Sequence, residues 1–190
     1  MNALESLIRE HQLIARLAAA LEAYARRLGQ GTLVDAGDLA LFARGFTEFA
    51  DDIHHDKEEN VLLPLLSREG FDWNTGVLAA VNQDHRQERY LIEVLAQLGE
   101  RPGSWSPEDC RHVVAAATAL CDFQRHHHQR ENGELFPEVG RRLSGRALDE
   151  LAAALAAFDA DPQHRERRAA AVAVAEQLIA RYAPEPGKPD

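Results

Sequence analysis

A metal-ligand pattern occurs twice in this chain of 190 residues. Each copy has a histidine, then a His-x-x-x-Glu pair farther along, and a proline six residues after the glutamate. The histidine precedes its pair by 43 residues in the first copy and by 42 in the second. The copies consist of His11, His54, Glu58 and Pro64, and of His85, His127, Glu131 and Pro137. Imidazole and carboxylate recurring in one register predict a single metal site built from two half-sites.

The apolar residues predict four long helices, over about residues 3–28, 35 or 38 to 66, 75–98 and 107–143. Each has an apolar stripe at helical period, and His11 lies inside the stripe of the first. Leucine and alanine dominate the apolar residues, which favours helices, and strand-like alternation is nearly absent. Long helices with short connections are typical of an up-down-up-down four-helix bundle. We therefore expect an all-α fold.

The rest of the chain predicts a C-terminal helical extension. Its two segments are amphipathic, and Asp161 followed by Pro162 is a helix-start signal. We expect residues 1–144 to form the bundle, 145–183 to form the extension packed on it, and 184–190 to be a disordered tail. Pro64 is expected to kink or tighten the last turn of the second helix, because it lacks an N–H and crowds the preceding turn.

The chemistry of the repeat favours iron. Residues four apart share a helix face, so each His-x-x-x-Glu pair aims at one point, and an antiparallel bundle brings all the candidates into one core layer. Polar groups buried without partners cost roughly 2–7 kcal/mol each. Two metal ions bridged by the two carboxylates would satisfy them. Carboxylate and imidazole without thiolate suit iron, with manganese or zinc as substitutes, better than a structural zinc site.

In the fourth helix His126, His127 and His128 are adjacent, so the metal ligand must be chosen among them. Four residues on from His126 is Arg130, which cannot bind a metal, and four on from His128 is Asn132, a poor ligand. Only His127 reaches a carboxylate at this spacing.

In the second helix, His55 with Glu59 repeats the spacing of His54 with Glu58, and the proline offset selects the latter pair. The remaining candidates are interpreted as residues that surround the ligands: His55, Glu59, His126 and His128. Either Asp56 or Asp84 is expected to orient an imidazole.

These segments resemble the hemerythrin-like (HHE cation-binding) family. The resemblance covers about residues 3–143 and is carried by Glu10-His11, His54 through Pro64, Asp84-His85, His127 through Glu131, and Leu135-Phe136-Pro137. It implies a four-helix bundle with two non-haem iron ions, an oxo or hydroxo bridge, and O2 or a related small molecule as ligand. Carried over by position, the metal ligands are His11, His54, Glu58, His85, His127 and Glu131.

The third helix departs from the family members that carry O2. Those have a second histidine one turn from the first, whereas Val81 and Arg89 stand four residues on either side of His85. Glu88 is a candidate substitute, with a surface salt bridge as the alternative. Without a substitute, one iron loses an imidazole and gains an open position, which favours redox reactivity over reversible O2 carriage.

Composition excludes several partners. The formal net charge is −10 and there is no run of lysine and arginine, so we expect no nucleic-acid binding. The basic cluster Arg165, Arg167 and Arg168 is interpreted as a solvated helix face. No leader and no membrane span are predicted, which favours a cytoplasmic protein with reduced cysteines. A homo-oligomer is left open.

The pattern and the resemblance together predict a di-iron protein that reacts with or senses O2, NO or peroxide. The alternatives are a di-iron oxygenase or peroxidase with an organic substrate, iron storage or buffering, and an interaction module whose metal only holds the fold. A substrate enzyme needs an apolar pocket. Aromatic residues could line one, although ordinary core packing is the favoured interpretation: Tyr24, Phe46, Phe49, Tyr90 and Phe123. No catalytic residue is assigned.

Overall fold

The computed structural model describes residues 3–101 and 105–183, and these two ranges are helical over most of their length and contain no strand. The prediction of an all-α fold is therefore confirmed. The expected tail at 184–190 lies outside the described residues. Within the described ranges, no helix is both long and apolar enough to cross a membrane.

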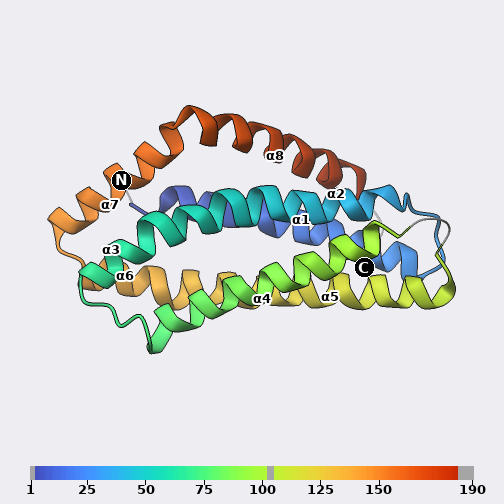
Figure 1. Cartoon of the computed structure of the whole chain (residues 1–190), viewed down its shortest axis with the longest axis horizontal. Helices are drawn as coiled ribbons and strands as arrows, with labels where there is room; N and C mark the ends of the chain where they lie inside the picture. The colour runs from blue at the N-terminus through green and yellow to red at the C-terminus, as the bar shows by residue number, and fades with distance from the viewer. Residues whose placement is uncertain (1–2, 102–104, 184–190) are drawn as a thin grey trace.

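Four long helical segments form the main body, residues 5–142. They are α1 (Glu5–Gly29); α2 (Gly37–Gly45) with the π-helices η1 (Phe46–His55) and η2 (Glu58–Leu62) and then α3 (Leu63–Arg68); α4 (Gly76–Gly99); and α5 (Pro107–Arg130) with the π-helix η3 (Glu131–Leu135) and then α6 (Phe136–Arg142). Successive segments run in opposite directions along the long axis (Figure 1). Helix α5 packs against α1 and α4, and α2 packs against α4.

Local signals explain where several helices begin and end. Ser106 starts α5 with a capping box, in which its hydroxyl accepts from the Asp109 N–H and the Asp109 carboxylate accepts from the Ser106 N–H. After α1 the chain turns at Gly31, whose φ of 73° is the left-handed conformation that glycine adopts at little cost. Asp161 caps the last helix by accepting from the N–H groups of Gln163 and His164.

The C-terminal extension consists of α7 (Gly145–Ala160) and α8 (Pro162–Arg181). Helix α8 packs along α1, α2 and η1, and Figure 1 shows it, coloured red, lying lengthwise over them. Arg167 pairs with Asp52 at 2.9 Å, and Arg168 pairs with Glu10. The interpretation of the basic cluster as a solvated face is therefore wrong only for Arg168, because Arg167 is exposed and its pair with Asp52 lies at the surface. It agrees with the exposure of Arg165.

The two repeated prolines each follow a widened turn. In η2 the Leu63 N–H donates to the carbonyl of Glu58, and in η3 the Phe136 N–H donates to the carbonyl of Glu131, so both bonds span five residues. Pro64 and Pro137 come next in the chain, and the wider turn relieves the clash that a proline ring makes inside an α-helix. The sequence left open whether Pro64 kinks or tightens the second helix. The turn before Pro64 is widened, so the expectation of a tightened turn is wrong.

Two apolar clusters fill the core. One includes Ile14, Leu17, Phe42, Phe46 and Leu120, and the other includes Leu7, Leu62, Val81, Leu135 and Phe136. Along every segment of the main body, the predicted metal ligands lie between residues of the first cluster and residues of the second. Tyr24 and Phe49 also belong to the first cluster, which agrees with ordinary core packing, whereas Tyr90 is 61% exposed and lines no interior pocket.

The close approach of α4 to α2 gives a stability prediction. A Cβ added at Gly99 would lie 2.8 Å from the backbone nitrogen of Ala40, which cannot move independently of its helix. Gly99→Ala should therefore lower the free energy of unfolding by about 1–3 kcal/mol. Gly140→Ala is the control, since nothing lies within 4 Å of its added Cβ, and it should stabilise by roughly 0.5–1 kcal/mol. Equal effects in urea denaturation would contradict this account of the packing.

Candidate metal centre

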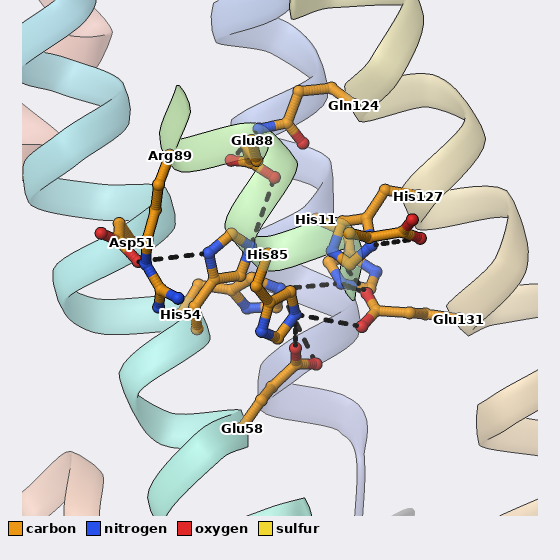
Figure 2. Close-up of polar contacts among 12 residues, drawn as sticks. His11, Asp51, His54, Glu58, His85, Glu88, Arg89, Gln124, His127 and Glu131 are labelled. Carbon is orange, nitrogen blue, oxygen red and sulfur yellow. Dashed lines mark hydrogen bonds and ion pairs between the residues drawn. The ribbon is translucent and has the colours of Figure 1, made fainter. Parts of the chain in front are cut away.

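A layer of buried polar side chains crosses the main body between the two apolar clusters. All six predicted ligands lie in this layer, and each is at most 3% exposed. They come from all four segments: His11 from α1, His54 from η1, Glu58 from η2, His85 from α4, His127 from α5 and Glu131 from η3. The structure therefore brings the two halves of the sequence repeat together, and Figure 2 shows their side chains converging.

The two His-x-x-x-Glu pairs face inward as predicted. His54 Nε2 lies 3.8 Å from a carboxylate oxygen of Glu58, and His127 Nε2 lies 3.4 Å from one of Glu131. The i,i+4 spacing places both members of each pair on one helix face. Each pair therefore offers one imidazole nitrogen and one carboxylate to the same space.

The upstream histidines join the two pairs. His85 Nε2 lies 3.2 Å from Glu58 Oε2 and 3.9 Å from Glu131 Oε1, so it faces both carboxylates. His11 Nε2 lies 3.0 Å from Glu131 Oε2 and also 3.0 Å from His54 Nε2. The ligand atoms of the two half-sites therefore face one another across a single space in the core.

Other side chains hold the opposite nitrogen of these imidazoles. Three of the Nδ1 atoms have hydrogen-bond partners: His11 with Asn132 at 3.2 Å, His54 with Glu10 at 3.1 Å and His85 with Glu59 at 2.8 Å. His127 Nδ1 lies 3.5 Å from Asp84 without a hydrogen bond. A partner at Nδ1 fixes the ring and leaves Nε2 free to bind a metal. Of the two aspartates considered for this role, Asp84 lies beside an imidazole, whereas Asp56 accepts a hydrogen bond from Asn60.

Two further histidines lie in the same layer. One triad of potential ligands is His11, His54 and His128, and the other is His55, His85 and His127; within each triad the ligand atoms are at most 4.8 Å apart. The His128 ring stacks on His11 with centroids 4.2 Å apart, and the His55 ring stacks on His85 at 4.0 Å. His126, by contrast, is exposed. The structure places ring nitrogens of His55 and His128 within 4.8 Å of those of predicted ligands, whereas the sequence suggested that both residues only surround the ligands.

The winding of η1 explains how neighbouring histidines both point inward. A π-helix has more residues per turn than an α-helix, so adjacent side chains are separated by a smaller angle around the axis. His54 and His55 end the π-helical stretch, and both are at most 1% exposed. Counting in α-helical steps allowed either His54 or His55 to face inward, and the π-helical winding lets both do so.

Glu88 on α4 is buried, so the surface salt bridge considered for it is wrong. Its side chain is 0% exposed, lies 3.4 Å from His55 Nε2, and accepts a hydrogen bond from the Gln124 amide. Figure 2 shows Glu88 and Gln124 meeting on one side of the layer. Glu88 thus lies buried beside His55 at the edge of the polar layer.

The central carboxylates and imidazoles perturb one another strongly. Burial and the negative charge of Glu131 raise the pKa of Glu58. Burial alone would raise the pKa of Glu131 too, but His127 and His11 hold it well below its usual range. Burial lowers the pKa of His54 well below the ordinary value and lowers that of His128 to about 3. For His11 and His85 burial alone would lower the pKa, but Glu58 and Glu131 raise it, so a metal ion would displace protons from these two imidazoles.

Unpartnered atoms test whether a metal fits. Both oxygens of Glu58 and of Glu131 are buried without a hydrogen-bond partner. The same is true of Nε2 in four histidines: His55, His85, His127 and His128. Such groups are costly in a dry core unless something binds them. Oxygen and imidazole donors, without sulfur, make up the set, which suits divalent first-row metals.

The metal-free protein should lose stability as pH rises from about 6.5 to about 8. Burial alone lowers the pKa of His55, but Glu88 and Asp51 raise it to about 8. Because the folded-state pKa exceeds the unfolded value, this contribution is complete below pH 6.5 and is lost as pH passes the folded pKa. It amounts to about 2 kcal/mol.

Urea unfolding with chelator at pH 6.5 and 8.5 measures this difference. His85, whose pKa is also raised, acts in the same direction. His55→Gln should reduce the difference. Because His54, His127 and His128 have lowered pKa values and act in the opposite direction, the comparison with the variant carries the test: an unchanged pH difference in His55→Gln would contradict the assignment.

A cavity of about 550 Å³ lies against the metal layer, between α1 and α5. Small side chains such as Ala15, Ala18 and Ala19 line one side, and His128 and Asn132 lie at the side nearest the layer. Asn132 also holds His11 Nδ1. The cavity thus leads to one of the two imidazole triads.

The fold and this layer are those of a helical protein whose buried His and Glu clusters could hold metal ions. The model of the hemerythrin HHE cation binding domain matches residues 2–139, which is most of the main body. The chain therefore belongs to that family. Neither a curated protein nor a solved structure matched it. The family match ends before the C-terminal extension.

Proposed function

We propose that this chain is a non-haem di-iron protein that reacts with or senses O2, NO or peroxide. In this proposal residues 1–144 form an up-down-up-down four-helix bundle that carries the iron, and residues 145–183 form an extension packed on it. The metal ligands are His11, His54, Glu58, His85, His127 and Glu131. The observation that carries the proposal is the pair of central carboxylates, all four of whose oxygens lack hydrogen-bond partners among converging imidazoles.

We further assign His55 and His128 as ligands, so that each metal has three imidazoles and a share of both carboxylates. The two triads support this assignment, and the other two histidines of each triad also group with Glu58 and Glu131. A centre with five protein donors per metal has fewer free positions than one with four.

The chain's own residues prepare the centre. Two iron ions bound there would supply one-electron redox chemistry at the positions that the protein leaves free. Glu10 and Glu59 hold Nδ1 of His54 and His85 and so orient their Nε2 atoms toward the carboxylates. The two apolar clusters exclude water from both sides of the layer.

The cavity between α1 and α5 supports a second candidate function, a di-iron oxygenase or peroxidase with an organic substrate. Its volume of about 550 Å³ falls in the range of pockets for small organic molecules, and it is mostly apolar with a few polar groups near the metal layer. Iron storage or buffering is the remaining alternative. Both cysteines are free thiols, which supports a cytoplasmic location.

Anaerobic reconstitution with ferrous iron tests the proposal. The loaded protein should bind iron in pairs and change its optical spectrum on addition of O2, NO or peroxide. Catalytic turnover of an added organic substrate would favour the oxygenase or peroxidase instead. A protein that takes up iron but gives no spectral response to any of the three would favour storage, and one that binds no iron would overturn the proposal.

A matched pair of variants tests the added imidazoles. His128→Gln should weaken iron binding, whereas His126→Gln, two residues away and exposed, should leave it unchanged. Equal iron affinity in the two variants would remove His128 from the ligand set.

A further inference from the structure

One buried carboxylate connects the C-terminal extension to the metal layer. Glu10, on α1, is 2% exposed. One of its oxygens lies 3.1 Å from His54 Nδ1, and the other lies 2.6 Å from the ammonium nitrogen of Lys57. Glu10 therefore touches a proposed metal ligand on one side and a buried cation on the other.

The extension supplies the remaining partners of this cation. Lys57 is fully buried, and its ammonium also lies 2.6 Å from Asp159 and 5.7 Å from the centroid of the Phe158 ring. A buried ammonium is strongly destabilising unless charged or polar groups surround it. Asp159 and Phe158 belong to α7. The main body thus relies on the extension to neutralise Lys57.

Arg168 of α8 completes the network. Its guanidinium donates to Glu10 and, at 2.8 Å, to Asp159. Glu10, Lys57, Asp159 and Arg168 form a neutral set of two acids and two bases, half from the main body and half from the extension. We call these four residues the Glu10 network. The family match ends at residue 139, so Asp159 and Arg168 lie outside it.

We propose that the C-terminal extension sets the orientation of His54 and the reduction potential of the bound metal, through Asp159 and Arg168 acting on Glu10. This rests on the proposed function for the metal itself. A carboxylate that accepts the Nδ1 proton makes the imidazole a stronger donor, which favours the oxidised metal. Cations beside that carboxylate weaken the effect. Arg168 and Asp159 are therefore positioning residues of opposite charge.

The opposite charges predict opposite shifts. Arg168→Gln removes a cation from Glu10, so the reduction potential of the iron should fall. Asp159→Asn removes an anion from Lys57 and Arg168, so both cations act more strongly on Glu10 and the potential should rise. Both residues are about one third exposed, and in either variant the buried charges of Lys57 and Glu10 remain paired with each other.

Spectroelectrochemical titration of the full-length, iron-loaded protein measures these shifts. Arg165→Gln is the control, since Arg165 lies on the same helix, is exposed and carries the same charge. We expect its potential to match that of the wild type. A purely structural role for the network would move both potentials in the same direction or not at all, and either result would overturn the proposal.

A chemical rescue sharpens the test. A cavity of about 360 Å³ borders Glu10, Asp159 and Arg168. Methylguanidinium added to Arg168→Ala should restore the wild-type potential, because it can replace the missing cation from this cavity. If Arg168→Ala changes the reduction potential but methylguanidinium does not shift it back, the guanidinium charge has no such role.

Nuclear magnetic resonance of the metal-free protein separates this proposal from the proposed function. Long-range proton–nitrogen spectra report whether the His54 proton resides on Nδ1, facing Glu10. We expect Arg168→Gln to move the His54 signals and Arg165→Gln to leave them in place. If the protein bound no iron, the proposed function would fail while this measurement still tested the positioning. Unmoved His54 signals would contradict the positioning role alone.

Discussion

Replacing Glu131 with alanine is expected to reduce bound iron from two ions per chain to one or none. Its carboxylate lies 3.0 Å from His11 Nε2, 3.4 Å from His127 Nε2 and 3.9 Å from His85 Nε2, so it faces both imidazole triads. Loss of a bridging carboxylate removes a donor from both metals at once. Elemental analysis after desalting measures the ratio.

Glu134→Ala is the matched control. Glu134 lies in the same π-helix, three residues from Glu131, but is exposed. It should retain the iron content of the wild type. Two tightly bound ions in Glu131→Ala would show that this carboxylate is not a shared ligand.

Iron binding should also raise the melting temperature strongly. Each ion present at about 100 times its dissociation constant stabilises the folded state by about 2.7 kcal/mol, so a pair contributes about 5 kcal/mol. For a chain of this size, that corresponds to roughly 10–20 °C. The physical cause is the set of buried, unpartnered carboxylate and imidazole atoms that the metals bind.

Differential scanning calorimetry with and without iron measures this shift. Glu131→Ala should show a much smaller shift than the wild type, and chelator should reverse the shift in the wild-type protein. Coinciding melting temperatures for the metal-free and iron-loaded wild type would mean that the polar layer is satisfied without metal.

The helices could be predicted from the sequence because their signals are local. Apolar residues at helical period and the Ser106-Pro107 start placed the four main segments within about two residues of their observed ends. The same reasoning placed His54 beside Glu58 and His127 beside Glu131, since the i,i+4 relation depends only on helix geometry. The repeat then predicted that the two pairs meet, as they do.

The π-helical turns could not be predicted from those rules. They arise before Pro64 and Pro137 and over residues 46–55, where counting in α-helical steps gives the wrong facing side chains. His55 was interpreted as a surrounding residue because the proline offset selected His54 with Glu58, and an α-helix does not turn both neighbours inward. The available signal was the proline six residues after each glutamate. It predicted a disturbed turn but not whether that turn would be wider or tighter than in an α-helix.

Contacts between distant segments were also beyond the sequence. Glu10 precedes a predicted ligand by one residue, yet nothing in the sequence indicates that its carboxylate reaches His54. Lys57 sits in a charged stretch that is typical of a surface, but the extension covers it completely. Ion pairs across more than 100 residues depend on how α8 packs, which composition alone does not determine.

The most direct test of a paired metal centre is X-ray diffraction from iron-loaded crystals at the iron absorption edge. The account predicts two anomalous scattering peaks between Glu58 and Glu131, one beside His11, His54 and His128 and the other beside His55, His85 and His127. A single peak, or peaks outside this layer, would contradict it.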